Sequence, residues 1–215
     1  MKHLNFWFDP ISPFACLAFE QLPRALEGLS VDVSYRPVLF AAMLKQWGQK
    51  GPAEIEPKRA WTFRHVHWLA HQHGVRLDTP LQHPFNPLAL LRLLWACAPE
   101  GGTPNRHACE TVLRHIWQGG ADANDPQRIA ALTQALAPLH HDPLGDRVKQ
   151  LLKDATADAL AHGLFGVPTV EVDGRLFWGL DALPMLADCL RGDAWFDGPA
   201  WDREGAPRAG LSRAS

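Results

Sequence analysis

The sequence predicts an α/β fold in which one sheet is interrupted by a large all-helical insertion. A strand, a helix and a second strand are predicted within the first 38 residues. More than a hundred residues of helical periodicity follow, and strand signals return near residue 169. The predicted order is therefore βαβ, a helical block and ββα. We assign residues 1–39 and 163–192 to the sheet-containing domain, 40–162 to the insertion and 193–215 to a C-terminal tail.

The composition is typical of a globular protein and excludes several classes of partner. The 215 residues are 47% hydrophobic and 20% charged, and a net charge of −2 gives no basic surface for nucleic acid. No apolar run approaches the ~20 residues of a membrane span. Asp9 and the prolines that follow it interrupt any N-terminal signal segment. Without an export signal, we expect the four cysteines to remain reduced in the cytoplasm. They form no C-x-x-C pair, so the sequence predicts neither a zinc knuckle nor a dithiol redox motif.

The first strand is predicted over Leu4–Phe8, an apolar and aromatic run of strand length. Asp9-Pro10 ends it, because proline cannot continue the hydrogen-bonded ladder. Ser12-Pro13 has the pattern of a helix start, with serine at the N-cap and proline at the first helical position. Apolar residues at helical spacing follow from Phe14. The serine hydroxyl is therefore expected at the positive end of a helix, where an anion is stabilised.

The alternative interpretation of Ser12 is that it only caps a helix. The same pattern is found four more times in the chain, and each instance predicts a helix start. These instances are Asn86-Pro87, Thr103-Pro104, Asp125-Pro126 and Asp142-Pro143.

A second strand is predicted over residues 31–38, where apolar and polar residues alternate, and it should lie parallel to the first strand. The insertion is then predicted to contain helices over residues 57–73, 86–97, 104–118, 126–137 and 143–162. The run LALLRLLWAC within the second of these helices predicts that it is buried.

A hairpin is predicted where strand signals return. Thr169–Val172 and Arg175–Trp178 flank Asp173-Gly174, a strong two-residue turn signal. Asp181 is then expected to cap a last helix that carries leucines at helical spacing. In the tail we expect three aromatic residues to pack back onto the body and the last ten residues to be disordered. These aromatic residues are Trp195, Phe196 and Trp201.

Four motifs in this order resemble the family of 2-hydroxychromene-2-carboxylate isomerases, relatives of the kappa-class glutathione transferases and of the DsbA group. They are FDPISPFACLA (8–18), HPFNP (83–87), FGVPT (165–169) and FWGLD (177–181). The resemblance covers residues 3–190 and implies a thioredoxin-like fold with a helical insertion, glutathione as cofactor and a homodimer. The Val-Pro-Thr motif resembles the cis-proline loop of thioredoxin-like folds. Where redox relatives have C-P-x-C, this chain has Ser12-Pro13-Phe14-Ala15, without either sulfur.

The resemblance implies a role for each matching residue of the glutathione site. Ser12 would hold the glutathione sulfur and donate a hydrogen bond that stabilises its thiolate. The backbone of Val167, before Pro168, would pair with the cysteinyl part of glutathione, and Asp181 would receive the γ-glutamyl amino group. Leu180 departs from the small polar residue of relatives, which puts one hydrogen bond at that end in doubt.

The remaining residues implied by the resemblance lie at the glycyl end of glutathione and around the substrate. Gln49 and Lys58 are the candidate contacts to the glycyl carboxylate. Gln49 stands where relatives have the asparagine of a Gly-Asn-x-Pro motif, and the run in this chain, Gly48-Gln-Lys-Gly-Pro52, differs from that motif by one residue. Phe14, Asn86 and Trp178 are the candidates for the wall of the substrate cavity, and the implied substrate is an aromatic chromene carboxylate. Capping is the competing role for Asn86.

Other readings of the sequence remain as alternatives. The same site would serve a glutathione transferase or peroxidase, while the absent C-P-x-C sulfurs argue against a thiol-disulfide oxidoreductase. A binding module in which Ser12 is only a cap is the fourth hypothesis. His67 and His71 are one helical turn apart, but the intervening residues lack the glutamate of the metalloprotease motif, so we predict no metal site.

Overall fold

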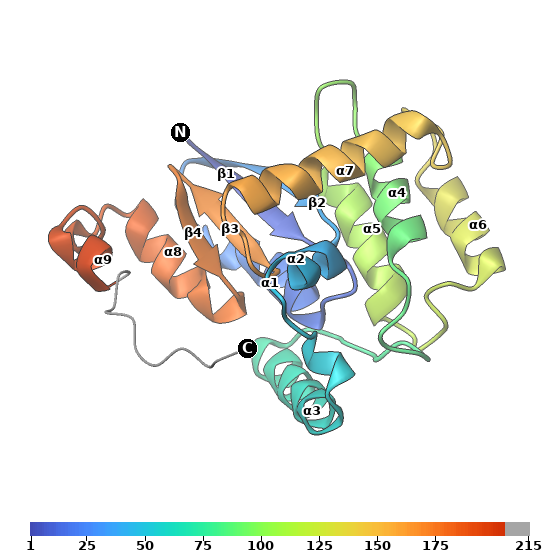
Figure 1. Ribbon diagram of the computed structural model, residues 1–215, viewed down its shortest axis with the longest axis horizontal. Coiled ribbons are helices and arrows are strands. Elements are labelled where there is room, and N and C mark those ends of the chain that lie inside the picture. The colour runs from blue at the N-terminus through green and yellow to red at the C-terminus, as the bar shows by residue number, and fades with distance from the viewer. Residues whose placement is uncertain (205–215) are drawn as a thin grey trace.

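A four-stranded sheet of order β2-β1-β3-β4 lies at the centre of the computed structural model, which describes residues 1–204 (Figure 1). Its strands are β1 (Lys2–Phe8), β2 (Val31–Pro37), β3 (Thr169–Val172) and β4 (Arg175–Trp178). β1 and β2 are parallel and are joined by α1 (Pro13–Ala25), whereas β3 is antiparallel to both β1 and β4. The predicted βαβ unit and the hairpin are confirmed.

The hairpin between β3 and β4 turns at Asp173 and Gly174, whose φ angles are 50° and 75°. Two successive positive φ angles match the right-handed twist of the flanking strands, which is why Asp-Gly is favoured there.

β1 is buried on both faces. Leu4, Phe6 and Phe8 point into a core formed with α1 and α5, and none of the three is exposed. The intervening Trp7 is equally buried in a second core on the opposite face, which includes Trp95 of α4 and Val148 of α7. This alternation follows from the period of two along a strand. The insertion therefore covers the sheet from both sides.

Between β2 and β3 the chain is largely helical. The helices are α2 (Phe40–Gln46), a 3₁₀ turn at Pro52–Glu54, α3 (Glu56–His73), α4 (Leu88–Ala96), α5 (Arg106–Trp117), α6 (Pro126–Ala135) and α7 (Asp146–Ala161). Figure 1 shows α7 running across the sheet and α3 projecting from the body. The sequence did not indicate α2. The division at residues 39/40 and 162/163 stays a prediction.

Three of the five predicted helix starts are displaced. Thr103-Pro104 precedes a later cap, Asn105, whose Oδ1 accepts the N–H of Ala108 at 2.9 Å. Asp142 accepts the N–H of Leu144 at 2.9 Å and forms a turn, so α7 begins only after Gly145. α4 likewise begins at Leu88, two residues after the start of the predicted range 86–97. Before α4 and α7 an asparagine or aspartate side chain thus closes a local turn, whereas in α5 a later asparagine takes the cap position.

The chain ends with α8 (Leu183–Leu190), a 3₁₀ turn at Ala194–Phe196 and α9 (Pro199–Glu204) beyond β4. Phe196 is buried and its ring lies 6.1 Å from that of Phe177, while Trp201 packs partly buried on the same core. Trp195 is 43% exposed. The prediction that the aromatic residues of the tail pack onto the body is therefore confirmed for Phe196 and Trp201 but not for Trp195. The disorder predicted for 206–215 concerns residues outside the described range. No helix in the described range is long and apolar enough to span a membrane.

Candidate functional site

Ser12 stands at the N-terminus of α1 and caps it. Its Oγ accepts a hydrogen bond from the backbone N–H of Ala15 at 3.2 Å, and Pro13 occupies the first helical position, as predicted. The residue is only 9% exposed. A hydroxyl has one O–H donor as well as two lone pairs. Capping uses a lone pair, so the O–H of Ser12 remains available to a second group, and the two interpretations of this residue are compatible.

The Val167–Pro168 peptide bond is cis, and its loop lies at the same edge of the sheet as Ser12. Thr169 is paired with Trp7 in antiparallel register, so the residues before Thr169 continue past the carboxyl end of β1, where the 9–12 turn begins. The loop is held by a bond from the Thr169 hydroxyl to the Gly166 carbonyl at 2.8 Å. The Pro168 carbonyl accepts the N–H of Gly179 at 2.9 Å.

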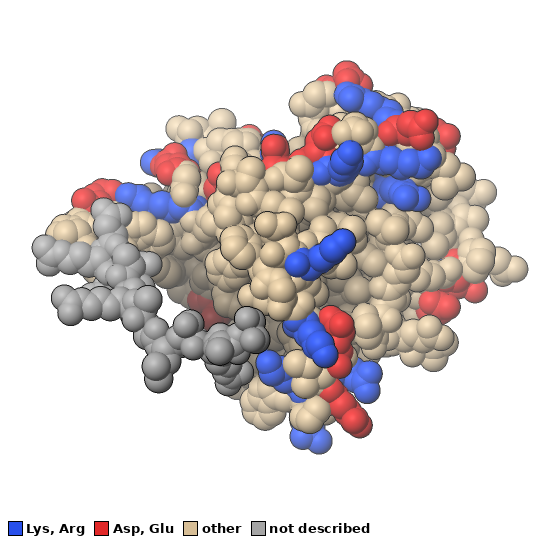
Figure 2. All heavy atoms as spheres, viewed as in Figure 1, with Lys and Arg blue, Asp and Glu red and all other residues tan. Residues whose placement is uncertain are grey.

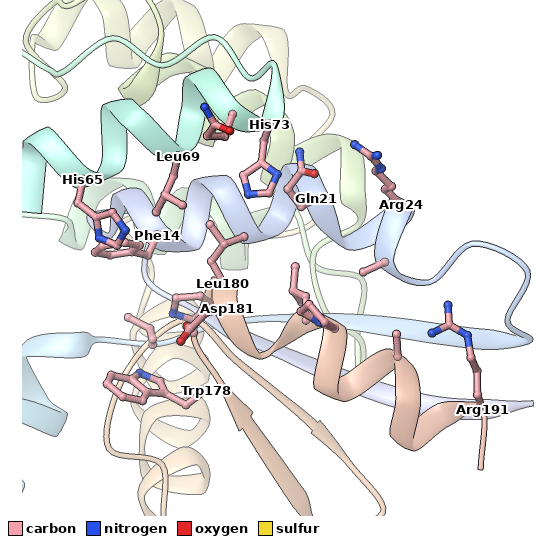
Figure 3. Close-up of a pocket in the computed structure, with 18 residues that line it drawn as sticks. Phe14, Gln21, Arg24, His65, Leu69, His73, Trp178, Leu180, Asp181 and Arg191 are labelled. Carbon is pink, nitrogen blue, oxygen red and sulfur yellow. The ribbon is translucent and has the colours of Figure 1, made fainter. Parts of the chain in front are cut away.

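A cleft of about 910 Å³ lies between α1, α3 and the segment that runs from the cis-proline loop to α8. Figure 3 shows Phe14 and His65 at one end of it, with Leu180 and Asp181 farther along and Arg24 and Arg191 beyond them. Six of the residues proposed from the sequence line this cleft. They are Phe14, Val167, Pro168, Trp178, Leu180 and Asp181.

The other four candidates are not among the residues that line the cleft. Ser12 is two residues before Phe14, at the head of the same helix. Gln49 and Lys58 are exposed, and Lys58 lies in a separate shallow hollow beside Trp61. Asn86 is exposed, and its Oδ1 accepts the N–H of Leu88 at 3.1 Å. This bond closes a turn before α4, whose N-cap is Pro87, so the predicted capping role of Asn86 is not observed. Functional roles for these four residues stay predictions.

Asp181 is not the N-cap of the last helix. The residue at that position is Ala182, which has no side chain able to cap, and Asp181 lies in the preceding 3₁₀ turn Leu180–Ala182. Its side chain is exposed and lines the cleft. The carboxylate folds back over Gly179, whose φ is 99° and where a Cβ would collide with Oδ1. The structure therefore leaves this carboxylate facing the cleft instead of the helix backbone.

The turn before α1 is held by Asp9, a residue that sequence reasoning treated only as a strand breaker. Asp9 is fully buried, and its carboxylate accepts the N–H groups of Ile11 at 3.0 Å and of Phe40 at 2.9 Å. Its carbonyl also accepts the N–H of Ser12 at 3.0 Å. Burial raises the pKa of Asp9 to about 7, although both backbone donors oppose this change. The signal in the sequence was an aspartate two residues before Ile11, the spacing of an Asx turn.

Two aromatic side chains of the insertion hold the carbonyls of the same turn. Trp117 Nε1 donates to the Pro10 carbonyl at 2.9 Å, and His83 Nε2 lies 2.9 Å from the Ile11 carbonyl. Because a carbonyl only accepts, the His83 proton is on Nε2. Burial lowers the pKa of His83, so it donates as a neutral ring.

Three of the four thiols, those of Cys16, Cys97 and Cys109, are buried and are poor candidates for redox chemistry. Burial raises the pKa values of Cys16 and Cys109 well above the ordinary value and that of Cys97 to about 11. Within the described range, no group of three or more His, Cys, Asp or Glu side chains is arranged to hold a metal ion. Figure 2 shows acidic and basic side chains interspersed on the visible face, without an extended basic surface.

Known proteins with similar sequences include 2-hydroxychromene-2-carboxylate isomerases and kappa-class glutathione S-transferases. The chain is 28% identical over 199 residues to the 2-hydroxychromene-2-carboxylate isomerase of Sphingobium xenophagum, which covers 88% of this chain and 98% of that protein. It is 26% identical over 214 residues to glutathione S-transferase kappa 1 of Homo sapiens, with coverage of 90% and 92%. A solved structure of a 2-hydroxychromene-2-carboxylate isomerase has the same fold, with a TM-score of 0.77, 18% identity and coverage of 95% and 100%.

The DSBA-like thioredoxin domain matches residues 3–191, which is most of the chain. The protein therefore belongs to the family of DSBA-like thioredoxin domains.

Proposed function

We propose that this protein is a glutathione-dependent isomerase of the 2-hydroxychromene-2-carboxylate type. The observation that carries the proposal is the buried hydroxyl of Ser12 at the head of α1, where redox relatives would have a cysteine. The helix N-terminus and a hydroxyl donor together favour a thiolate over a thiol. Burial keeps Cys16 and Cys109 protonated, which is consistent with a thiolate brought in by glutathione, as the resemblance implies.

Glutathione would lie along the cleft with its cysteinyl backbone paired to Val167 beside Pro168. Its γ-glutamyl ammonium would then meet the carboxylate of Asp181, which lines the same cleft. Leu180, also in the cleft, contributes only apolar contact at that end. Gln49 and Lys58 are the proposed partners of the glycyl carboxylate.

The aromatic substrate would enter at the end of the cleft where Phe14 and Trp178 lie, and Asn86 is the third proposed substrate contact. The thiolate forms a carbon–sulfur bond to the unsaturated substrate and permits ring opening and rotation about the resulting single bond. Elimination then breaks the same carbon–sulfur bond and returns the thiolate. No net oxidation takes place, and glutathione is regenerated in each cycle.

The experiment is to follow the chromene carboxylate by ultraviolet spectroscopy with the purified protein, with and without glutathione. We expect isomerisation that depends on glutathione and is lost in Ser12→Ala. Equal rates with and without glutathione would show that the proposal is wrong.

A kappa-class transferase or peroxidase is the second candidate, because relatives of both names have nearly the same identity to this chain. Conjugation of an electrophilic aryl halide without isomerase activity would favour it. A thiol-disulfide oxidoreductase is less favoured because residues 12 and 15 are serine and alanine. Failure to reduce insulin disulfides would exclude it.

We also propose that the protein acts in the cytoplasm as a homodimer. The family resemblance implies a homodimer, and the proposal applies this property to the present chain. The aromatic side chains of Trp61 and Trp68 in α3 are large and exposed. They support the dimer proposal because exposed apolar surface favours association between subunits.

A further inference from the structure

The turn that precedes Ser12 is fixed by groups that lie far away in the sequence. Phe40 N–H, His83 Nε2 and Trp117 Nε1 bind Asp9, Ile11 and Pro10 across separations of 31, 72 and 107 residues. All three donors come from the insertion, and each engages a different residue of the turn. Inside the turn, Ile11 and Ser12 donate to Asp9. Each residue from Asp9 to Ser12 is thus hydrogen-bonded.

We infer that the helical insertion positions Ser12 for thiolate stabilisation by binding the three residues that precede it, with Trp117 and His83 as the positioning residues. The inference rests on the proposed function of Ser12.

The physical reason is the direction of the carbonyl dipoles. The carbonyls of Pro10 and Ile11 come immediately before the N-terminus of α1, and a carbonyl oxygen turned toward a thiolate would repel it. The indole of Trp117 and the neutral ring of His83 hold these two oxygens toward the insertion without placing a charge there. The N–H groups of the first turn of α1 are then left as the dipoles at its N-terminus.

The buried environment makes these bonds specific. Trp117 is not exposed at all, so water cannot replace its N–H if the indole is lost. The ring of His83 lies among the rings of Phe63, Phe85 and Trp117, and its buried Nδ1 has no hydrogen-bond partner within the described residues. Its sole hydrogen bond within that range is therefore the one to the Ile11 carbonyl.

The test uses Trp117→Phe, which keeps an aromatic ring but removes the N–H. The chain offers a matched control in Trp95→Phe, because Trp95 Nε1 is also buried and donates to a proline carbonyl, that of Pro37, at 3.0 Å. The readout is the ultraviolet absorbance of the glutathione thiolate bound to the full-length protein, titrated with pH. Asp9, His83 and Arg59, the titratable or charged groups beside the turn, are retained in both variants.

We expect Trp117→Phe to raise the pKa of the bound thiol by about one unit, a roughly tenfold loss of thiolate below that pKa. We expect Trp95→Phe to lower the melting temperature but to leave the thiol pKa unchanged. His83→Ala should act like Trp117→Phe, and His83→Gln, which retains an N–H donor, should restore much of the thiolate.

Three results would overturn the inference. A wild-type thiol pKa in Trp117→Phe would show that the bond does not act on the site. Equal shifts in Trp117→Phe and Trp95→Phe would show general loosening of the core. Absence of any thiolate signal in the wild type would instead overturn the proposed function, and the inference with it.

Discussion

At the scale of single residues, Ser12 combines a structural bond with a free donor. Its lone pair caps α1 through Ala15, and its O–H has no acceptor among the described residues. The sequence presented capping and catalysis as alternatives, whereas the geometry allows one hydroxyl to serve both. A substitution at this position therefore has two separable consequences.

Replacing Ser12 with alanine should lower the free energy of unfolding by about 1 kcal/mol, because the cap is lost. It should also abolish formation of the glutathione thiolate. Asn105→Ala is the matched control, since Asn105 caps α5 through Ala108 at 2.9 Å and does not line the cleft. Chemical denaturation should give similar losses for both variants. A normal thiolate in Ser12→Ala would contradict the assigned role.

Asp9 predicts a specific dependence of stability on pH. Its pKa in the folded protein, about 7, is above the ordinary value of 3.8, so the folded state holds the proton more tightly than the unfolded state. The stabilisation from this group is therefore complete below about pH 4 and is lost as pH rises toward 7. Asp9→Asn cannot titrate, and its amide accepts only one of the two backbone bonds.

We expect the wild type to be more stable than Asp9→Asn at low pH, and this advantage to shrink between about pH 4 and 7. The loss of one buried acceptor costs about 1–3 kcal/mol throughout. Urea denaturation of both proteins across this range measures the difference. A stability difference that does not change with pH would show that Asp9 does not titrate in this way.

At the scale of elements, α1 contains a proline that removes one hydrogen bond from the helix, and a side chain of α5 supplies a replacement donor. Pro23 lacks an N–H, so the Phe19 carbonyl has no partner within α1. Arg106, at the start of α5, donates to this carbonyl from Nη1 at 3.3 Å and from Nη2 at 3.4 Å. Its guanidinium also lies 4.1 Å from the centroid of the Phe19 ring. The insertion thus completes the hydrogen bonding of the site-bearing helix.

Arg106→Ala should lower the free energy of unfolding by about 2 kcal/mol, because it leaves a buried carbonyl unpaired. Pro23→Ala returns an N–H to α1, so Arg106→Ala should cost less in that background. The double-mutant cycle should give a coupling of roughly 1 kcal/mol by denaturation. Additive effects would show that the carbonyl is not the shared element.

At the scale of the whole molecule, α3 leaves an aromatic surface in solvent. Trp61 and Trp68 are 66% and 56% exposed, and the ring of His65 stacks on both. The face of α3 that carries both tryptophans therefore points outward.

We therefore expect the protein in solution to have twice the chain mass of 23.9 kDa. Sedimentation velocity measures this directly. Trp68→Lys should shift the protein toward the monomer if the surface is buried between subunits. A monomer at every concentration would contradict the dimer proposal.

The sequence by itself determined the features that depend on neighbours in the chain. The Asp173-Gly174 hairpin, the caps at Ser12 and Asp125 and the two-sided burial of β1 follow from local hydrogen bonds and from the period of a strand. The six motif residues that line the cleft were expected from the family resemblance and not from local signals of this kind.

Only the tertiary structure decided which oxygen closes each helix start and what holds the site. Asn105 replaces Thr103 as a cap, and Asp181 turns to the cleft, because competing local turns differ little in free energy and packing selects among them. The bonds from His83 and Trp117 to the turn before Ser12 join residues 72 and 107 positions apart. No periodicity or spacing in a single sequence records such contacts, since they form only when the insertion folds against the sheet.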